Sequence, residues 1–163
     1  MDINLHAYGN AQETQENGNF KVTCQHGDLE CKLNTVANCV KHLYKDKKPH
    51  GRDVEFVHCL LNDSSPTMVK AKDCAHSNGL HWDNIHGCST GLLGYHLQHK
   101  EAAITPPHDQ IPWVMVNGVG ESQDQEDLRI HLEEIVCQEY KGDKPTPCTT
   151  AAEKKYLIPR DDC

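Results

Sequence analysis

Residues 24–44 read CQHGDLECKLNTVANCVKHLY, a stretch that combines closely spaced cysteines with a helical pattern. Its apolar side chains recur at intervals of four, three, four and three residues, at Leu29, Leu33, Val36, Val40 and Leu43. Residues with that spacing share one face of an α-helix. Asp28 is a suitable N-cap, and Pro49-His50-Gly51 lies beyond the last apolar position. We therefore predict an amphipathic helix that begins near Asp28.

The cysteines of this stretch allow two interpretations. Cys31 and Cys39 are eight residues apart, which places them on a similar face of the helix, where both could form disulfides with other segments. Alternatively, Cys24, His26 and Cys31 could form a metal or redox site. Zinc ligands usually come in pairs two to four residues apart, and the chain contains no Cys-x-x-Cys, so the spacing favours disulfides.

The composition narrows the classes of function. The chain has 163 residues, the size of one compact domain, and its 16 basic and 24 acidic residues give a net charge of −8. The absence of a run of about twenty apolar residues argues against a membrane-spanning helix. The acidic balance argues against binding to nucleic acid, because such binding depends on neutralising phosphates. Nine cysteines are typical of exported, disulfide-bonded proteins, and twelve histidines would change the charge between neutral and acidic compartments.

The remainder of the chain predicts further short elements. Alternating residues predict a strand over 2–7, and the polar residues 12–19 are interpreted as a loop. Helices are predicted over 53–61, from Ser65-Pro66 to Gly79, around 92–97 and over 128–140. Asn117-Gly118 predicts a two-residue hairpin turn. We expect residues 143–163 to form a mobile tail, because they are rich in proline and show no periodicity.

The cysteine stretch also fits the pattern Cys-Gln-His-Gly-x-x-Glu-Cys-x-x-Asn-x-x-x-x-Cys. All eight fixed positions are met, by Cys24, Gln25, His26, Gly27, Glu30, Cys31, Asn34 and Cys39. Through this signature the chain resembles the gamma-interferon-inducible lysosomal thiol reductase family. Flanking features agree with the resemblance: Tyr8-Gly9-Asn10-Ala11, the pair Cys74 and Cys88, and Pro106-Pro107-His108 leading to Ile111-Pro112-Trp113-Val114 and Asn117-Gly118.

The resemblance implies an α/β, thioredoxin-like fold with a helical, disulfide-stapled insertion. On this basis we expect residues 1–142 to form the domain, with the insertion at about 29–103. The resemblance further implies a substrate groove at Ile111, Pro112 and Trp113, a cis peptide bond before Pro112, and a disulfide between Cys74 and Cys88. The cysteines assigned to structural disulfides are Cys24, Cys31, Cys39, Cys59, Cys74, Cys88, Cys137 and Cys148, which leaves Cys163 unpaired. The implied partners are disulfide-bonded proteins in a lysosomal or secretory compartment, and no cofactor or metal is expected.

One departure from the family concerns the catalytic cysteines. Members reduce disulfides with a Cys-x-x-Cys pair upstream of the signature, in which one thiolate attacks the substrate and the second cysteine releases it. Here no cysteine precedes Cys24. We therefore expect a catalytically incomplete chain that lacks the first strand, the first helix and a signal peptide, with Met1 as an internal start in a longer protein. Without the first strand, segments 2–7 and 112–119 lose their shared neighbour, and we expect marginal folding.

Other interpretations remain open at this point. A non-enzymatic, secreted or lysosomal binding module that keeps the groove without turnover is the main alternative function. The histidines between Cys74 and Cys88 could form a zinc site with these two cysteines, although a disulfide with surface histidines is the simpler interpretation. Asn62-Asp63-Ser64 is an N-glycosylation sequence, usable if the chain enters the secretory pathway.

Overall fold

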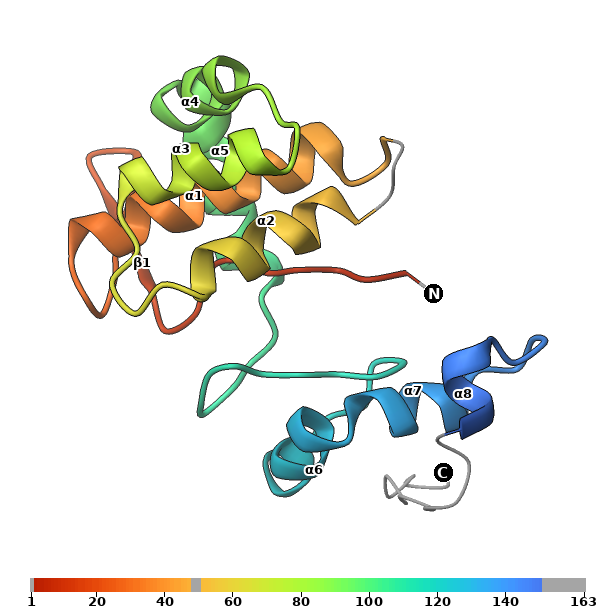
Figure 1. Cartoon of the computed structure of the whole chain (residues 1–163). Helices are drawn as coiled ribbons and strands as arrows, with labels where there is room; N and C mark the ends of the chain where they lie inside the picture. The colour runs from red at the N-terminus through yellow and green to blue at the C-terminus, as the bar shows by residue number, and fades with distance from the viewer. Residues whose placement is uncertain (1, 48–50, 151–163) are drawn as a thin grey trace. The chain divides into compact units, whose positions relative to one another are not determined.

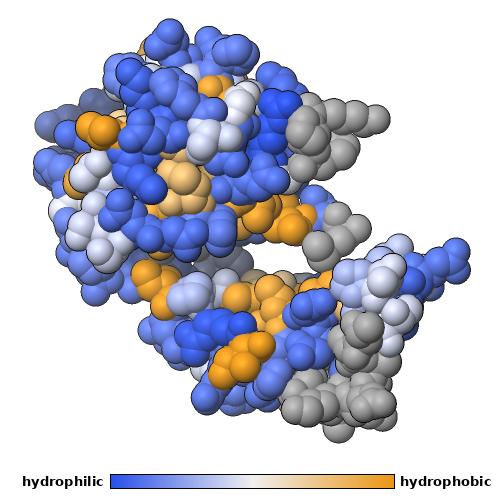
Figure 2. Space-filling view, viewed as in Figure 1, coloured by the Kyte–Doolittle hydropathy of each residue, from blue (hydrophilic) through white to orange (hydrophobic). Residues whose placement is uncertain are grey.

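The computed structural model describes residues 2–47 and 51–150, and it divides the chain into two compact units, residues 1–106 and 107–163. The fold is mixed α/β but mostly helical, with a small two-stranded sheet (Figure 1). Among the described residues, no helix is both long enough and apolar enough to span a bilayer. The face shown in Figure 2 is mostly hydrophilic, with small hydrophobic patches.

The first unit is built around one long helix. Its elements are β1 (Gln12–Glu16), β2 (Asn19–Thr23), α1 (Asp28–Tyr44), α2 (Arg52–Leu61), α3 (Met68–Ser77), α4 (Trp82–Thr90) and α5 (Leu92–Ile104). Helix α1 contacts each of the other four helices, as Figure 1 shows. The predicted apolar stripe contributes Leu33, Val36 and Val40 to the core, where they meet Phe56 and Ile85. Leu29 is 42 % exposed, because the first turn of α1 extends beyond this core.

The helix predictions for this unit were largely confirmed, with corrections at the ends. Helix α1 begins at Asp28, but its N-cap is Gly27. The N-cap of α3 is Thr67, whose Oγ1 accepts a hydrogen bond from the Lys70 N–H at 3.1 Å, so this helix begins after Ser65-Pro66 and not at it. Helix α4 was not predicted, because its nine residues contain few apolar positions.

The segment predicted to be a loop forms an antiparallel hairpin. Strands β1 and β2 pair from Gln12↔Thr23 to Glu16↔Asn19, around a turn in which Asn17 and Gly18 both have positive φ. Type I′ hairpin turns require positive φ at both central residues, which Asn-Gly supplies at low cost. The loop prediction was wrong because the Asn17-Gly18 turn forms a hairpin even though residues 12–16 are polar and mostly exposed.

The segment predicted to be a strand, residues 2–7, pairs with no strand of the described chain. Side chains spaced along α1 bind its backbone instead: Lys41 Nζ donates to the Leu5 carbonyl, and Asn38 Nδ2 donates to the Ala7 carbonyl at 3.0 Å. Asn34 Nδ2 donates to the Tyr8 carbonyl at 3.4 Å. The prediction was wrong because the amphipathic alternation fits a segment lying along a helix as well as a strand in a sheet.

The second unit holds η1 (Ser122–Asp124), α6 (Gln125–Ile130), α7 (Leu132–Glu139) and α8 (Thr146–Thr150). Asn117-Gly118 forms the predicted turn, closed by a single bridge between Val116 and Val119. The helix predicted over 128–140 is broken at His131, where the sequence has neither glycine nor proline to signal a break. Within the predicted tail, α8 is held by a disulfide between Cys137 and Cys148.

Candidate functional site

The signature residues build the entry into α1. The disulfide Cys24–Cys31 spans the start of the helix, with a Cα–Cα distance of 5.5 Å. Between the two cysteines, Gly27 has a φ of 89° and forms the N-cap. Glu30, in the first turn, accepts a hydrogen bond from the His26 backbone N–H at 2.6 Å and lies 3.2 Å from His26 Nδ1. A glutamate at this position satisfies a backbone donor at the helix start, as in a capping box.

The other signature residues connect this entry to the rest of the unit. Asn34 binds the carbonyl of Tyr8, and Gln25 Oε1 accepts from Asn10 Nδ2 at 3.1 Å. Cys39, fully buried, forms a disulfide with Cys88 in α4. The signature therefore fixes a turn, a helix start and the attachment of both to the N-terminal segment.

Four disulfides pair all eight of the cysteines that the sequence assigned to structural bridges. They are Cys24–Cys31, Cys39–Cys88, Cys59–Cys74 and Cys137–Cys148. The expected pair Cys74–Cys88 is wrong, because α1 lies against both α3 and α4 and brings Cys39 to Cys88, while Cys74 faces Cys59 in α2. Cys163, expected to be unpaired, lies outside the described residues.

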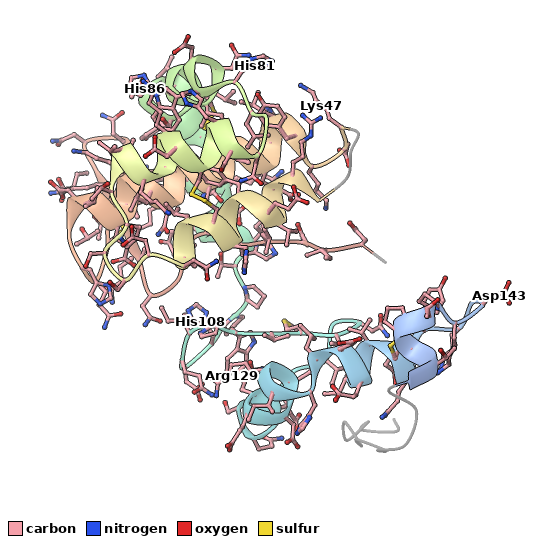
Figure 3. The ribbon with its side chains drawn as sticks, viewed as in Figure 1. Lys47, His81, His86, His108, Arg129 and Asp143 are labelled. Carbon is pink, nitrogen blue, oxygen red and sulfur yellow. A yellow bond between two sulfur atoms is a disulfide. The ribbon has the colours of Figure 1, made fainter. Side chains whose placement is uncertain are left out.

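The suggested metal sites do not assemble in the described part of the chain. Within it, no three His, Cys, Asp or Glu side chains gather in a geometry that could hold a metal ion. Cys24 and Cys31 are bonded to each other, and Cys74 and Cys88 belong to different disulfides. His81 and His86 are labelled in Figure 3. His81 is the N-cap of α4, His86 lies within that helix, and both side chains are exposed.

The proline loop, residues 109–114, contains the residues expected to form the substrate groove. The Ile111–Pro112 peptide bond is cis. Ile111 is 44 % exposed and Pro112 is also exposed, while Trp113 is half-buried with its ring 6.4 Å from that of His108. His108, labelled in Figure 3, is the residue directly before this loop. The loop thus exposes two neighbouring apolar side chains, Ile111 and Pro112.

A buried ionic cluster that sequence reasoning missed holds the N-terminal segment in place. Glu101 in α5 is 5 % exposed; its Oε1 accepts from Lys41 Nζ at 2.9 Å, and its Oε2 lies 2.8 Å from His6 Nδ1. In the same N-terminal segment, burial, and to a smaller degree the negative charge of Glu13, raises the pKa of the Tyr8 hydroxyl above its ordinary value. The partners are 60 and 95 residues apart in the chain, so no local pattern could have revealed the cluster.

Asn62 is the C-cap of α2 and is exposed, as an N-glycosylation acceptor must be. Its Nδ2 lies 3.3 Å from His58 Nε2 one turn earlier.

Residues 1–78 match the family model described as gamma interferon inducible lysosomal thiol reductase. Over most of its length the chain is similar in sequence to members of this family. It is 34 % identical, over 95 % of its length, to the gamma-interferon-inducible lysosomal thiol reductase of Carassius auratus, and 36 % identical, over 97 %, to that of Mus musculus. It is 31 % identical, over 93 %, to the gamma-interferon-responsive lysosomal thiol protein of Arabidopsis thaliana. The chain spans 62 % of the length of each of these three relatives.

Proposed function

We propose that this chain is part of a thioredoxin-like thiol reductase that acts on protein disulfides in an acidic, lysosomal compartment. The similarity to the thiol reductase family supports the activity, and the names of the relatives support the compartment. The observation that carries the proposal is the disulfide-bonded signature at the start of α1, with all eight fixed residues in defined contacts or bonds. In this proposal the proline loop binds the substrate, and the stapled helical unit is the insertion of the domain.

We further propose that the chain by itself is catalytically incomplete. Reduction of a disulfide needs a thiolate that attacks one substrate sulfur and a second thiol that resolves the mixed disulfide, so two cysteines become oxidised as two substrate thiols form. The sequence contains no Cys-x-x-Cys, and every described cysteine is already in a disulfide. In this proposal the chain supplies substrate contacts, and a nucleophile pair outside this sequence attacks the substrate disulfide.

A reductase assay at acidic pH tests this proposal. The purified chain, with dithiothreitol as the source of electrons, is expected to reduce a disulfide-bonded protein no faster than dithiothreitol alone. A C163S variant controls for the cysteine outside the described residues. Turnover by the chain that persists in C163S would overturn the claim of incompleteness.

The second candidate is a non-enzymatic binding module. It is favoured by the exposure of Ile111 and Pro112 in a chain whose described cysteines are all paired. Binding of an intact disulfide-bonded protein without its reduction would favour the module.

We also propose that Asn62 carries a glycan. Expression through a secretory pathway should give a mass increase that N62Q removes.

A further inference from the structure

A buried glutamine in the second unit is bonded to the backbone of the proline loop. Gln125, the first residue of α6, has 0 % relative exposure. Its Oε1 accepts a hydrogen bond from the Val114 N–H, and its Nε2 donates to the Val114 carbonyl, each at 2.8 Å. The side-chain amide therefore satisfies both backbone groups of one residue, as a paired residue of a neighbouring strand would do.

Val114 lies where the Asn117-Gly118 hairpin would continue. Val116 and Val119 exchange both of their backbone hydrogen bonds across the Asn117-Gly118 turn. Val114 lies two residues before Val116, so its N–H and carbonyl point to the same edge of the extended segment. The next rung of the hairpin would pair Val114 with a residue after Val119, but Gln125 occupies that place.

The backbone leaves space for the glutamine only because residue 120 is glycine. A Cβ built on Gly120 would lie 2.4 Å from the Val114 carbonyl oxygen and 3.2 Å from Gln125 Nε2. Any side chain at this position would clash with the Val114 carbonyl and crowd Gln125 Nε2. The pairing of Gln125 with Val114 therefore depends on a glycine at position 120.

A second contact anchors the other end of the loop. Ser122 Oγ donates to Asp109 Oδ2 at 2.6 Å. Ser122 and Gln125 are three residues apart across η1 and the start of α6, so one short helical segment holds both Asp109 and Val114. The residues between these anchors include Ile111, Pro112 and Trp113, which are the residues of the proposed substrate groove.

We propose that Gln125 is a positioning residue for substrate binding, which fixes the proline loop by pairing with Val114. This inference rests on the proposed function, because it assigns the substrate to the loop that Gln125 holds. Val114 is satisfied by Gln125, whereas no backbone hydrogen bond joins the next residue, Met115, to another residue of the described ranges 2–47 and 51–150. Gln125 itself does not touch the substrate.

Binding of a short, fluorescently labelled peptide closed by one disulfide, followed by anisotropy, tests the proposal. All proteins carry C163S so that thiol exchange does not contribute. Q125L removes both hydrogen bonds and is expected to weaken binding by about tenfold, whereas Q98L, which removes the 3.4 Å bond from Gln98 Nε2 to the Cys31 carbonyl in the first unit, leaves binding unchanged. Equal binding by Q125L would overturn the role of Gln125 and leave the groove intact. No binding by the unsubstituted protein would overturn the groove itself.

The variant Q125E supplies a readout that a general loss of stability would not produce. An ionised carboxylate accepts from the Val114 N–H but cannot donate to its carbonyl, whereas a protonated carboxyl does both. Peptide binding and the fluorescence of the adjacent Trp113 should therefore be perturbed in Q125E at neutral pH and recover below about pH 5, as the new carboxyl protonates. Recovery should be absent in Q125L, and the unsubstituted protein is measured over the same pH range. Failure of Q125E to recover would contradict the proposal.

Hydrogen exchange of the unsubstituted chain gives a test that needs no variant to fold. The Val114 amide should exchange slowly and the Met115 amide rapidly. Equal, rapid exchange at both positions would show that Gln125 does not hold the loop.

Discussion

Removal of the disulfide between Cys39 and Cys88 should destabilise the first unit more than removal of any other described disulfide in it. It joins the centre of α1 to α4 across 49 residues of sequence, and both cysteines are buried. On the chain-entropy relation, closing a loop of that length contributes about 4.1 kcal/mol at 25 °C. The Cys24–Cys31 bridge closes a separation of 7, for which the same relation gives about 2.4 kcal/mol.

The double variant C39A/C88A tests this magnitude without leaving a free thiol. Loss of about 4 kcal/mol is a large share of the stability of an ordinary domain, about 5–15 kcal/mol. With a urea m-value of about 2 kcal/mol/M, the midpoint should fall by about 2 M. The space left by two buried sulfur atoms adds to the loss and does not oppose it. Urea unfolding followed by circular dichroism gives the measurement, and the matched control is C24A/C31A.

The comparison between the two double variants decides the interpretation. The expected midpoint for C39A/C88A lies below that for C24A/C31A. An equal or smaller effect of C39A/C88A would refute the reasoning that loop length governs these bridges. Non-reducing peptide mapping should recover a peptide pair linking Cys39 to Cys88; a pair linking Cys74 to Cys88 would show that the pairing itself is different.

Three further outcomes are expected. E101Q should lower the free energy of unfolding by about 3 kcal/mol, because Lys41 loses its buried partner; E16Q, at the exposed pair Glu16–Lys21, should cost under about 1 kcal/mol in the same denaturation experiment. The pKa of Tyr8 is raised in the folded state, so the free energy of unfolding should fall as the pH rises from the pKa of unfolded tyrosine, about 10, through the higher pKa of the folded state. Y8F should remove that part of the pH dependence, measured by denaturation at several pH values. T67A should cost about 1 kcal/mol, measured by thermal unfolding, because α3 loses its N-cap hydrogen bond.

Local patterns predicted the elements whose signals lie within a few residues. The four-three spacing of apolar residues predicted α1, and Asn117-Gly118 predicted its turn. The same dipeptide at Asn17-Gly18 has nearly the same φ values, 52° and 79° against 53° and 81°, and would have predicted the β1–β2 hairpin. The signal for that hairpin is therefore present in the sequence, although its strands are polar.

The sequence by itself determined the similarity to the family, the long helix, the tight turns and which eight cysteines form bridges, because motifs and side-chain periodicity are local properties of the chain. Only the tertiary structure decided which cysteines pair, because the packing of four helices determines which cysteine lies next to Cys39. It also decided that Glu101 meets Lys41 and that Gln125 pairs with Val114. These contacts depend on how separate elements pack against one another. A polar side chain needs a protein partner only where packing has removed it from water, and no local sequence pattern indicates which side chain that partner is.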